Sequence, residues 1–407
     1  MSPTIKTEEK LELINLKDQD LIDFTRTQNS LAWKGVLSSK DYVLRELVLG
    51  KSRIANDGDN ELKVFMLKDL NTDQPLCSIE LLIRESLKFH YNETTQKSEI
   101  KKVLSGTVGG VFTYPEHRGK GYARVMVDKL VDIARKEYLG NDGFIFLYSE
   151  IGEYYAKNGF KSFGIDLVKI DINDNLNLDD VPDISYDIIP YHDFENLIQQ
   201  YRSKFLSEIE HKISKDHKTR ISINPTSHLI DWFHLRSKFI TYKLFESKQE
   251  SQQDFFDFQN ESYDSIRENF EKSQPKIFGL KTFNSSNEVD GFIVWTIDWA
   301  EDKSENFATI LKIVSFDNEP QTTINLINLA LNHLHKTPIM NKPTTKLTIW
   351  ESEISEQTKK FLVKQYNAKT GIDNSSRSAI LMCDSSEDVK LRNGDLIWEE
   401  NTKLPWF

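Results

Sequence analysis

The segment Val111–Ala123 constrains the fold of this chain more than any other part of the sequence. A β-rich run, Thr107–Tyr114, stops at Pro115, and a basic turn with two glycines follows. An amphipathic helix then begins near Ala123, because apolar residues recur on one helical face at positions 123, 127, 130, 131 and 134. A strand, a glycine-containing turn and a helix in this order predict an α/β fold with an anion site at the start of the helix.

The turn itself predicts a pyrophosphate ligand. Gly119 and Gly121 allow the backbone to approach a ligand closely, while Arg118 and Lys120 add positive charge. The turn lacks both Gly-Lys-Ser/Thr and Gly-x-Gly-x-x-Gly, so it is neither a nucleoside-triphosphate loop nor a dinucleotide fingerprint. The alternative is an ordinary strand-to-helix turn on the surface. The residues that we expect to bind the ligand are Val111, Phe112, Thr113, Arg118, Gly119, Lys120, Gly121, Tyr122 and Ala123.

Arg118, Gly121 and Ala123 occupy the three defined places of the pattern Arg/Gln-x-x-Gly-x-Gly/Ala. With its flanking strand and helix, this segment closely resembles the acetyl-CoA pyrophosphate motif of the GNAT superfamily of N-acyltransferases. The resemblance implies acetyl-CoA as the co-substrate and a mixed sheet in which this strand bulges and splays to admit the pantetheine arm. The pair Gly109-Gly110 is typical of such a bulge. The acetyl carbonyl would then meet a strand N–H near Val111–Thr113.

A second segment, at the expected distance, supports the same resemblance. The apolar strand Phe144–Tyr148 is followed by a turn and by a short helix, 153–160, that ends with Gly159-Phe160. It resembles the aromatic-Tyr-x-x-x-Gly-Phe segment that ends the superfamily core. In that family the tyrosine at the position of Tyr155 often donates a proton to the departing CoA thiolate. The alternative for Tyr155 is packing on a helix face, which is the role that we expect for Tyr154.

Charge and composition exclude several other classes of protein. The chain has 407 residues, 38% of them hydrophobic and 28% charged, and no apolar run reaches the roughly 18 residues that a membrane span needs. The net charge of −11 argues against nucleic-acid binding and suits a cationic substrate such as an amine. The nine histidines form no metal-binding pattern, so we expect no metal. A polar start and only two cysteines, Cys77 and Cys383, predict a cytoplasmic protein in a reducing compartment.

The order of predicted elements repeats along the chain. The division that we expect is an N-terminal GNAT domain, an Asp/Asn-rich linker and a C-terminal GNAT-like domain with a tail, at residues 1–172, 173–184 and 185–407. In the second half, the strand 307–316 runs into Asp317–Pro320, an acidic turn without glycine that cannot hold a pyrophosphate. We therefore expect tandem GNAT-like modules, a CoA-binding one followed by a degenerate one; the alternative is an unrelated α+β domain. Two local predictions are a strand over 239–245 and a hairpin tip or loop over 86–102.

The general base is harder to assign. A lysine amine has a pKa of about 10.4 and must lose a proton to attack a thioester, yet the strand 104–114 carries no carboxylate. Glu80 and Glu150 are the side-chain candidates, and the alternative for each is a solvated carboxylate. The α-carboxylate of Phe407 is a third candidate for base or amine anchor, because the aromatic tail Leu404–Phe407 predicts docking into a pocket. Some two-module GNAT proteins of mycobacteria, similar in length and ending, use their terminal carboxylate in this way; the alternative is that the tail packs on the second module.

Outer segments resemble the fungal lysine acetyltransferase family, which has two modules and matches this chain over almost its full length. These segments are Trp33–Leu37, Tyr42, Arg45-Glu46, Tyr148–Gly152 and Trp406-Phe407. The resemblance implies free L-lysine as the acceptor, acetylated on its side-chain amine for catabolism. Arg45, Arg84 and Arg236 are available to bind its carboxylate. Two alternatives stay open: a non-catalytic CoA-binding or scaffold protein, and an acetyltransferase for protein lysines or N-termini.

Overall fold

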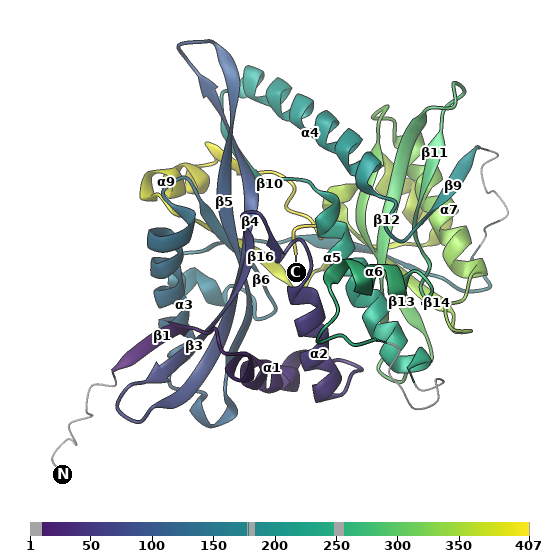
Figure 1. The fold of residues 1–407 in the computed structure, drawn as a ribbon. Helices are drawn as coiled ribbons and strands as arrows, with labels where there is room; N and C mark the ends of the chain where they lie inside the picture. The colour runs from purple at the N-terminus through teal and green to yellow at the C-terminus, as the bar shows by residue number, and fades with distance from the viewer. Residues whose placement is uncertain (1–9, 177, 179–183, 248–255, 407) are drawn as a thin grey trace.

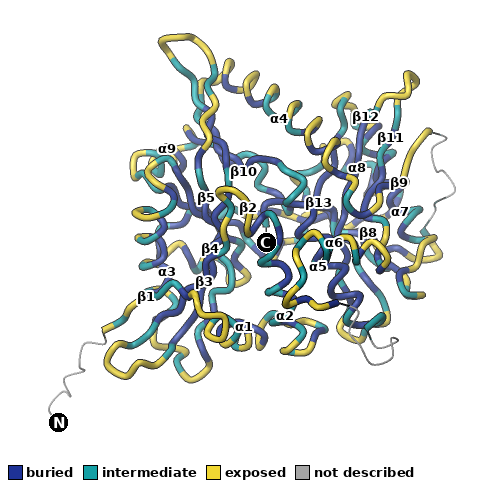
Figure 2. Tube along the Cα trace, in the orientation of Figure 1, coloured by how far each residue is buried: buried dark blue, intermediate teal, exposed yellow. Residues whose placement is uncertain are grey.

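Two mixed β-sheets with helices against them make up the protein (Figure 1). The structure is a computed structural model that describes residues 10–176, 178, 184–247 and 256–406. Within these ranges, no helix is long and apolar enough to cross a membrane. Figure 2 shows that the strands of both sheets are largely buried, whereas exposed residues gather at hairpin tips and on the outer faces of helices.

The N-terminal sheet is built mostly from the first half of the chain. Its strands in spatial order are β1 (Leu11–Asn15), β3 (Asn60–Asp69), β4 (Gln74–Asn92), β5 (Lys97–Thr113), β6 (Phe144–Ser149), β16 (Arg377–Met382) and β7 (Lys161–Phe163). Three further strands pair at its margins, namely β2 (Asn56–Asp57) with β3, β10 (Thr219–Ile223) with β4, and β17 (Leu396–Trp398) with β10. The parallel pair β5–β6 lies near the middle of this sheet.

The C-terminal sheet has seven strands. In spatial order they are β15 (Lys369–Asp373), β8 (Asp166–Asp171), β14 (Thr344–Trp350), β13 (Asn306–Ser315), β12 (Val289–Trp299), β11 (Ile277–Phe283) and β9 (Tyr186–Pro190). The α-helices are α1 (Gln19–Trp33), α2 (Ser39–Gly50), α3 (Tyr122–Ile133), α4 (Glu195–Asp216), α5 (Ser227–Thr241), α6 (Tyr263–Phe270), α7 (Pro320–Lys336), α8 (Glu356–Tyr366) and α9 (Ser385–Asn393). Apolar stripes bury α3 against the first sheet and α7 against the second.

The two sheets exchange a strand. β8 follows β7 in the chain but pairs with β14 and β15 of the C-terminal sheet, where Leu167 lies opposite Trp350. In return, β16 lies antiparallel between β6 and β7 of the N-terminal sheet, where Ile380 lies opposite Phe146. Each sheet is thus completed by the other half of the chain, which holds the two modules together. The boundaries predicted around residues 173–184 stay a prediction, because the sheets exchange strands across them.

A helix replaces the strand that we predicted over 239–245. α5 runs to Thr241 and continues into a π-helical turn, Tyr242–Glu246. Every residue from Leu229 to Thr241 except Arg236 is buried, because α5 lies between the two sheets (Figure 1). The strand prediction was wrong for a physical reason. A helix that is covered on nearly all sides has no broad polar face, so its sequence lacks the 3.6-residue alternation that reveals a helix.

The β4–β5 hairpin is longer than the sequence indicated. β4 runs to Asn92 and β5 begins at Lys97, so most of the range 86–102 is strand rather than loop. β10, from the second half of the chain, pairs with β4 here. Phe89 of β4 also packs edge-on against Phe205 of α4, with ring centroids 6.1 Å apart. The polar sequence suggested a loop because the elements that cover this hairpin come from a distant part of the chain.

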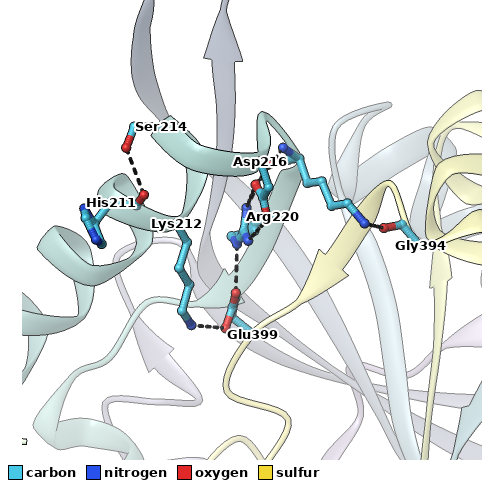
Figure 3. Close-up of polar contacts among 8 residues, drawn as sticks. His211, Lys212, Ser214, Asp216, Arg220, Gly394 and Glu399 are labelled. Carbon is cyan, nitrogen blue, oxygen red and sulfur yellow. Dashed lines mark hydrogen bonds and ion pairs between the residues drawn. The ribbon is translucent and has the colours of Figure 1, made fainter.

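The segment after β17 is tied to α4 and β10 before it reaches the space between the sheets. Glu399 accepts a hydrogen bond from Arg220 Nε over 2.9 Å and pairs with Lys212 Nζ at 3.1 Å (Figure 3). Arg220 also pairs with Asp216, with Nη2 and Oδ2 2.6 Å apart. These contacts hold the segment that leads to the tail against α4 and β10.

Candidate active site

The basic turn after β5 is open to solvent at the start of α3. Gly119 and Gly121 have φ values of +77° and +84°, in the left-handed region that favours glycine. Gly121 is the N-cap of α3, and no side-chain hydrogen bond from a described residue caps this helix. A Cβ at either glycine would meet no atom within 4 Å. Arg118 Nε donates to the Thr113 carbonyl over 3.1 Å, which ties the turn to β5. The geometry suits an anion held by first-turn N–H groups.

β5 separates from β6 where the sequence predicts a bulge. Parallel pairing of the two strands ends at Val108 opposite Leu147, although both strands continue. On the other side of β5, the register with β4 shifts beside Glu80, and Gly110 has a φ of +57°. The predicted glycine bulge is confirmed. It leaves the edge of β5 from Gly109 to Val111 facing a cavity.

That cavity has a volume of about 460 Å³ and lies between the two modules. This volume lies within the range of small-molecule sites. Besides the β5 edge, the first module contributes Trp33, Tyr42, Arg45, Glu46, Glu80, Leu147, Tyr148, Glu150, Ile151 and Tyr155. The second module and the tail contribute Trp232, Phe233, Arg236, Thr296, Asp298, Lys403 and Trp406.

Tyr155 faces the cavity from the short 3-10 helix Tyr154–Asn158. Only 7% of Tyr155 is exposed, and this burial, helped by Tyr154 and Glu150 nearby, raises the pKa of its phenol above the usual value. The phenol is therefore protonated at neutral pH, as a proton donor to a leaving thiolate must be. Tyr154 packs edge-on against Tyr155, with ring centroids 5.3 Å apart.

Glu80 lies beside the bulge, on β4. A Cβ at Gly110 would lie 3.3 Å from the Glu80 Cγ. Glu80 is 6% exposed, and burial raises the pKa of its carboxyl from 4.5 to about 7. Arg26 opposes this effect, because its Nε lies 3.8 Å from Oε1 of Glu80. A carboxyl that titrates near neutral pH and faces the cavity can accept a proton from an amine.

The other two candidate bases differ in position. Glu150 lies exposed at the cavity, and its Oε2 accepts a hydrogen bond from Trp33 Nε1 over 3.3 Å. Phe407 lies outside the described residues, so the role of its α-carboxylate stays a prediction. The residue before it does reach the cavity. Trp406 stacks on Tyr148, with ring centroids 5.4 Å apart and planes inclined by 23°.

Arg84 holds the tail instead of lining the cavity. Its guanidinium is fully buried, and Nη2 donates to the Pro405 carbonyl over 2.6 Å and also to Thr107. Tyr148 donates from its hydroxyl to the Thr402 carbonyl over 3.1 Å. The tail is therefore anchored on the N-terminal sheet as well as on the second module.

Comparison with known proteins identifies the family. Residues 175–407, more than half of the chain, match the model of the LYC1 GNAT-like C-terminal domain. The chain belongs to this family. Residues 87–164, which hold the basic turn and Tyr155, match the Acetyltransferase (GNAT) family. This LYC1-like protein is therefore an N-acetyltransferase, a GNAT enzyme that transfers an acetyl group to an amine.

The chain is also similar to individual proteins and solved structures. The LYC1-like chain is 28% identical to the uncharacterized protein YGR111W of Saccharomyces cerevisiae over 96% of each chain. It is 30% identical to a lysine acetyltransferase of Yarrowia lipolytica over 167 residues, 37% of this chain and 40% of the relative. A GCN5-related N-acetyltransferase from Anabaena variabilis has a similar fold, with a TM-score of 0.50, 12% identity and coverage of 92% and 73%. A conserved Enterococcus faecalis protein of unknown function has a TM-score of 0.52, 9% identity and the same coverage.

In the second GNAT-like module of this LYC1-like protein, an acidic side chain occupies the turn between β13 and α7. Between β13 and α7, the Asp317 carboxylate accepts hydrogen bonds from Glu319 N over 2.9 Å and from Thr322 Oγ1 over 2.7 Å, and also from Ser315. A carboxylate thus occupies the start of α7, where the equivalent place at α3 is open. The prediction of a degenerate second module is confirmed in its fold and explained by this contact.

The second module and the tail contribute cavity residues that the sequence did not single out. Asp298 of β12 forms an ion pair with Arg236 of α5, and Lys403 of the tail lies near both. Arg236 alone was a candidate from the sequence. No local motif marks Asp298 or Lys403, because they come together only through the packing of α5, β12 and the tail. The one signal in the sequence was the charged Arg236 among the apolar residues of 229–241.

Proposed function

We propose that this protein transfers the acetyl group of acetyl-CoA to the side-chain amine of free L-lysine. The observation that carries the proposal is a single cavity shared by the splayed edge of β5, the Tyr155 phenol and the Glu80 carboxylate. The lysine acetyltransferase of Yarrowia lipolytica, to which part of this chain is similar, supports lysine as the acceptor.

The donor would lie along the gap between β5 and β6. Residues 118–123 would hold its pyrophosphate with backbone N–H groups and the charges of Arg118 and Lys120. The thioester carbonyl would lie at the β5 edge near Val111–Thr113, where a strand N–H can stabilise the negative charge that develops on the oxygen. The open turn and the end of pairing at Val108 both support this placement.

Two side chains would move the protons of the reaction. Glu80 takes a proton from the acceptor amine, directly or through a water molecule, so that the nitrogen lone pair can attack the carbonyl carbon. The new C–N bond replaces the C–S bond, and Tyr155 protonates the departing thiolate. Solvent then returns the proton to Tyr155 and takes the one from Glu80. Glu80 fits the role of base better than Glu150, because it is buried beside the β5 bulge whereas Glu150 is exposed.

The position of the tail at the cavity favours a small acceptor over a protein acceptor. Trp406 and Lys403 occupy one side of the cavity, and Arg84 and Tyr148 hold the segment that carries them. A protein substrate would have to insert its lysine past this anchored segment. A free amino acid needs no such opening.

Release of CoA from acetyl-CoA across a panel of amines tests the proposed function. The panel contains free amino acids, polyamines and lysine peptides, and mass spectrometry identifies the product. We expect the highest kcat/KM for L-lysine, with Nε-acetyllysine as the product. Preference for a peptide would instead indicate a protein acetyltransferase. Absence of turnover with every amine, with acetyl-CoA binding retained in calorimetry, would indicate a non-catalytic CoA-binding protein.

A further inference from the structure

Charged side chains from the second module and the tail line the same cavity as the acetyl-transfer groups. Arg236 and Asp298 form an ion pair in which the Arg236 Nη1 contacts Asp298 Oδ1. Lys403 lines the same cavity from the tail. The acetyl-transfer groups Tyr155 and Glu80 belong to the first module, whereas these three belong to the second module and the tail. The two modules therefore contribute different groups to one cavity.

The Arg236–Asp298 pair has unused hydrogen-bonding capacity. Their side chains are 26% and 44% exposed, and they line the cavity. In the described ranges, Arg236 donates to no other acceptor, although a guanidinium has five N–H donors. Asp298 likewise keeps its second carboxylate oxygen for another donor. The pair can bind one anionic and one cationic group at the same time.

Lys403 supplies a second basic group. Its Nζ lies 3.0 Å from the ring centroid of Trp406 and 5.4 Å from that of Phe233. Across the residues that the structure describes, its ammonium forms no ion pair. Burial lowers the pKa of the Lys403 amine, with Asp298 and Glu150 opposing this effect. A desolvated amine next to a cavity is stabilised as an ammonium when an anion binds beside it.

We propose that Arg236 and Lys403 bind the α-carboxylate of the acceptor and that Asp298 binds its α-ammonium group. The acceptor is then a free α-amino acid whose second amine lies at the end of an apolar chain. This inference rests on the proposed acetyl transfer and adds the residues that select its substrate. Trp232, Phe233 and Trp406 also line the cavity and can pack against the methylene groups.

Charge complementarity favours this acceptor over the other amines. A polyamine offers no anion to the free N–H donors of Arg236 or to Lys403, so neither group would gain an anionic partner when it binds. An internal lysine of a protein has amide groups in place of the charged amine and carboxylate, and it would satisfy neither these cations nor Asp298. The α-amino acid head group matches all three side chains.

Three acceptors test the carboxylate and the α-amine of the head group separately. L-Lysine carries both charges, cadaverine is lysine without the carboxylate, and 6-aminohexanoate is lysine without the α-amine. All three keep the distal amine, so the acetyl-transfer chemistry is the same. We expect kcat/KM to be higher for L-lysine than for either analogue by about 100-fold, the typical effect of one missing partner in a desolvated charged contact.

Two variants separate the roles of the side chains. Arg236→Met should lower kcat/KM by about 100-fold for L-lysine and 6-aminohexanoate, mainly through KM, and leave cadaverine nearly unchanged. Asp298→Asn should lower it for L-lysine and cadaverine and spare 6-aminohexanoate. Retained turnover of the spared acceptor shows that each variant is folded. Arg53→Met is the matched control, because it breaks an Arg–Asp pair with Asp264 (N–O 3.1 Å) outside the cavity.

An activity-independent measurement completes the test. L-Norleucine has the head group and the four-carbon chain of lysine but no distal amine, so calorimetry should detect its binding to the wild type and not to Arg236→Met or Lys403→Met. If norleucine binds but no amine is turned over, the proposed acetyl transfer is refuted, whereas the head-group subsite is still supported. Equal kcat/KM for lysine and cadaverine in the wild type, or unchanged ratios in both variants, would overturn the subsite.

Discussion

Replacement of Glu80 by glutamine should change activity and stability in opposite directions. Glutamine has the shape of a protonated glutamate but cannot accept the proton of an amine. If Glu80 is the general base, Glu80→Gln should lower kcat/KM for acetyl transfer by a factor on the order of 100 to 10,000. The binding of acetyl-CoA should not change, because Glu80 lies on β4 and not in the basic turn.

The gain in stability follows from the pKa of Glu80. Burial raises this pKa from 4.5 to about 7, which means that the folded state disfavours the charged carboxylate. Below pH 4.5 Glu80 is protonated in both the folded and the unfolded state, so the preference of the folded state for the protonated form is fully met. As the pH rises through about 7, Glu80 becomes charged in the folded state and this stabilisation is lost. At pH 8 the charge then costs about 3 kcal/mol of folding free energy, and glutamine avoids this cost. Protonated Glu80 is also a neutral neighbour for Arg26. Glutamine at this position therefore reproduces the protonated state of the wild type.

Urea unfolding at pH 8 and at pH 4.5 measures the effect. We expect the variant to exceed the wild type by about 3 kcal/mol in free energy of unfolding at pH 8 and by much less at pH 4.5. The wild type should also show a rising limb of kcat/KM near pH 7 that the variant lacks, since the base acts only when deprotonated. Activity within twofold of the wild type would refute the role of Glu80, and a less stable variant at pH 8 would refute the argument from burial.

Three further variants test the remaining parts of the site. Arg26→Gln removes the positive charge that lowers the Glu80 pKa, so the rising limb of kcat/KM should move to higher pH; a limb that stays in place contradicts the pairing. Tyr155→Phe should lower kcat by about 100-fold or more with unchanged acetyl-CoA binding in calorimetry, and an unchanged kcat would exclude Tyr155 as the acid. Gly121→Ala should raise the KM for acetyl-CoA and cost about 1 kcal/mol, because its φ is +84°. Gly58→Ala, at a φ of +60° with equally open surroundings, should match that cost in thermal unfolding without the change in KM, and equal KM values in both variants would argue against the turn as the pyrophosphate site.

The sequence alone determined the anion turn and the strand that leads to it. Gly119 and Gly121 mark left-handed backbone, and Gly109-Gly110 marks the bulge, because few other residues adopt these conformations without strain. Such features depend on a dozen neighbouring residues, so a linear pattern contains them. Asp317–Pro320 is equally local, and its acidity was enough to predict a second module without an anion site.

The tertiary structure decided everything that depends on burial and on distant partners. The range 239–245 is helical because two sheets cover it. Glu80 and Glu150 were both candidate bases in the sequence, and burial, which raises the pKa of Glu80, favours Glu80 over the exposed Glu150. Arg236, Asp298 and Lys403 are far apart in the chain and line one cavity because α5, β12 and the tail pack together. Desolvation and charge pairing arise from what surrounds a side chain in space, and a linear sequence does not contain that information.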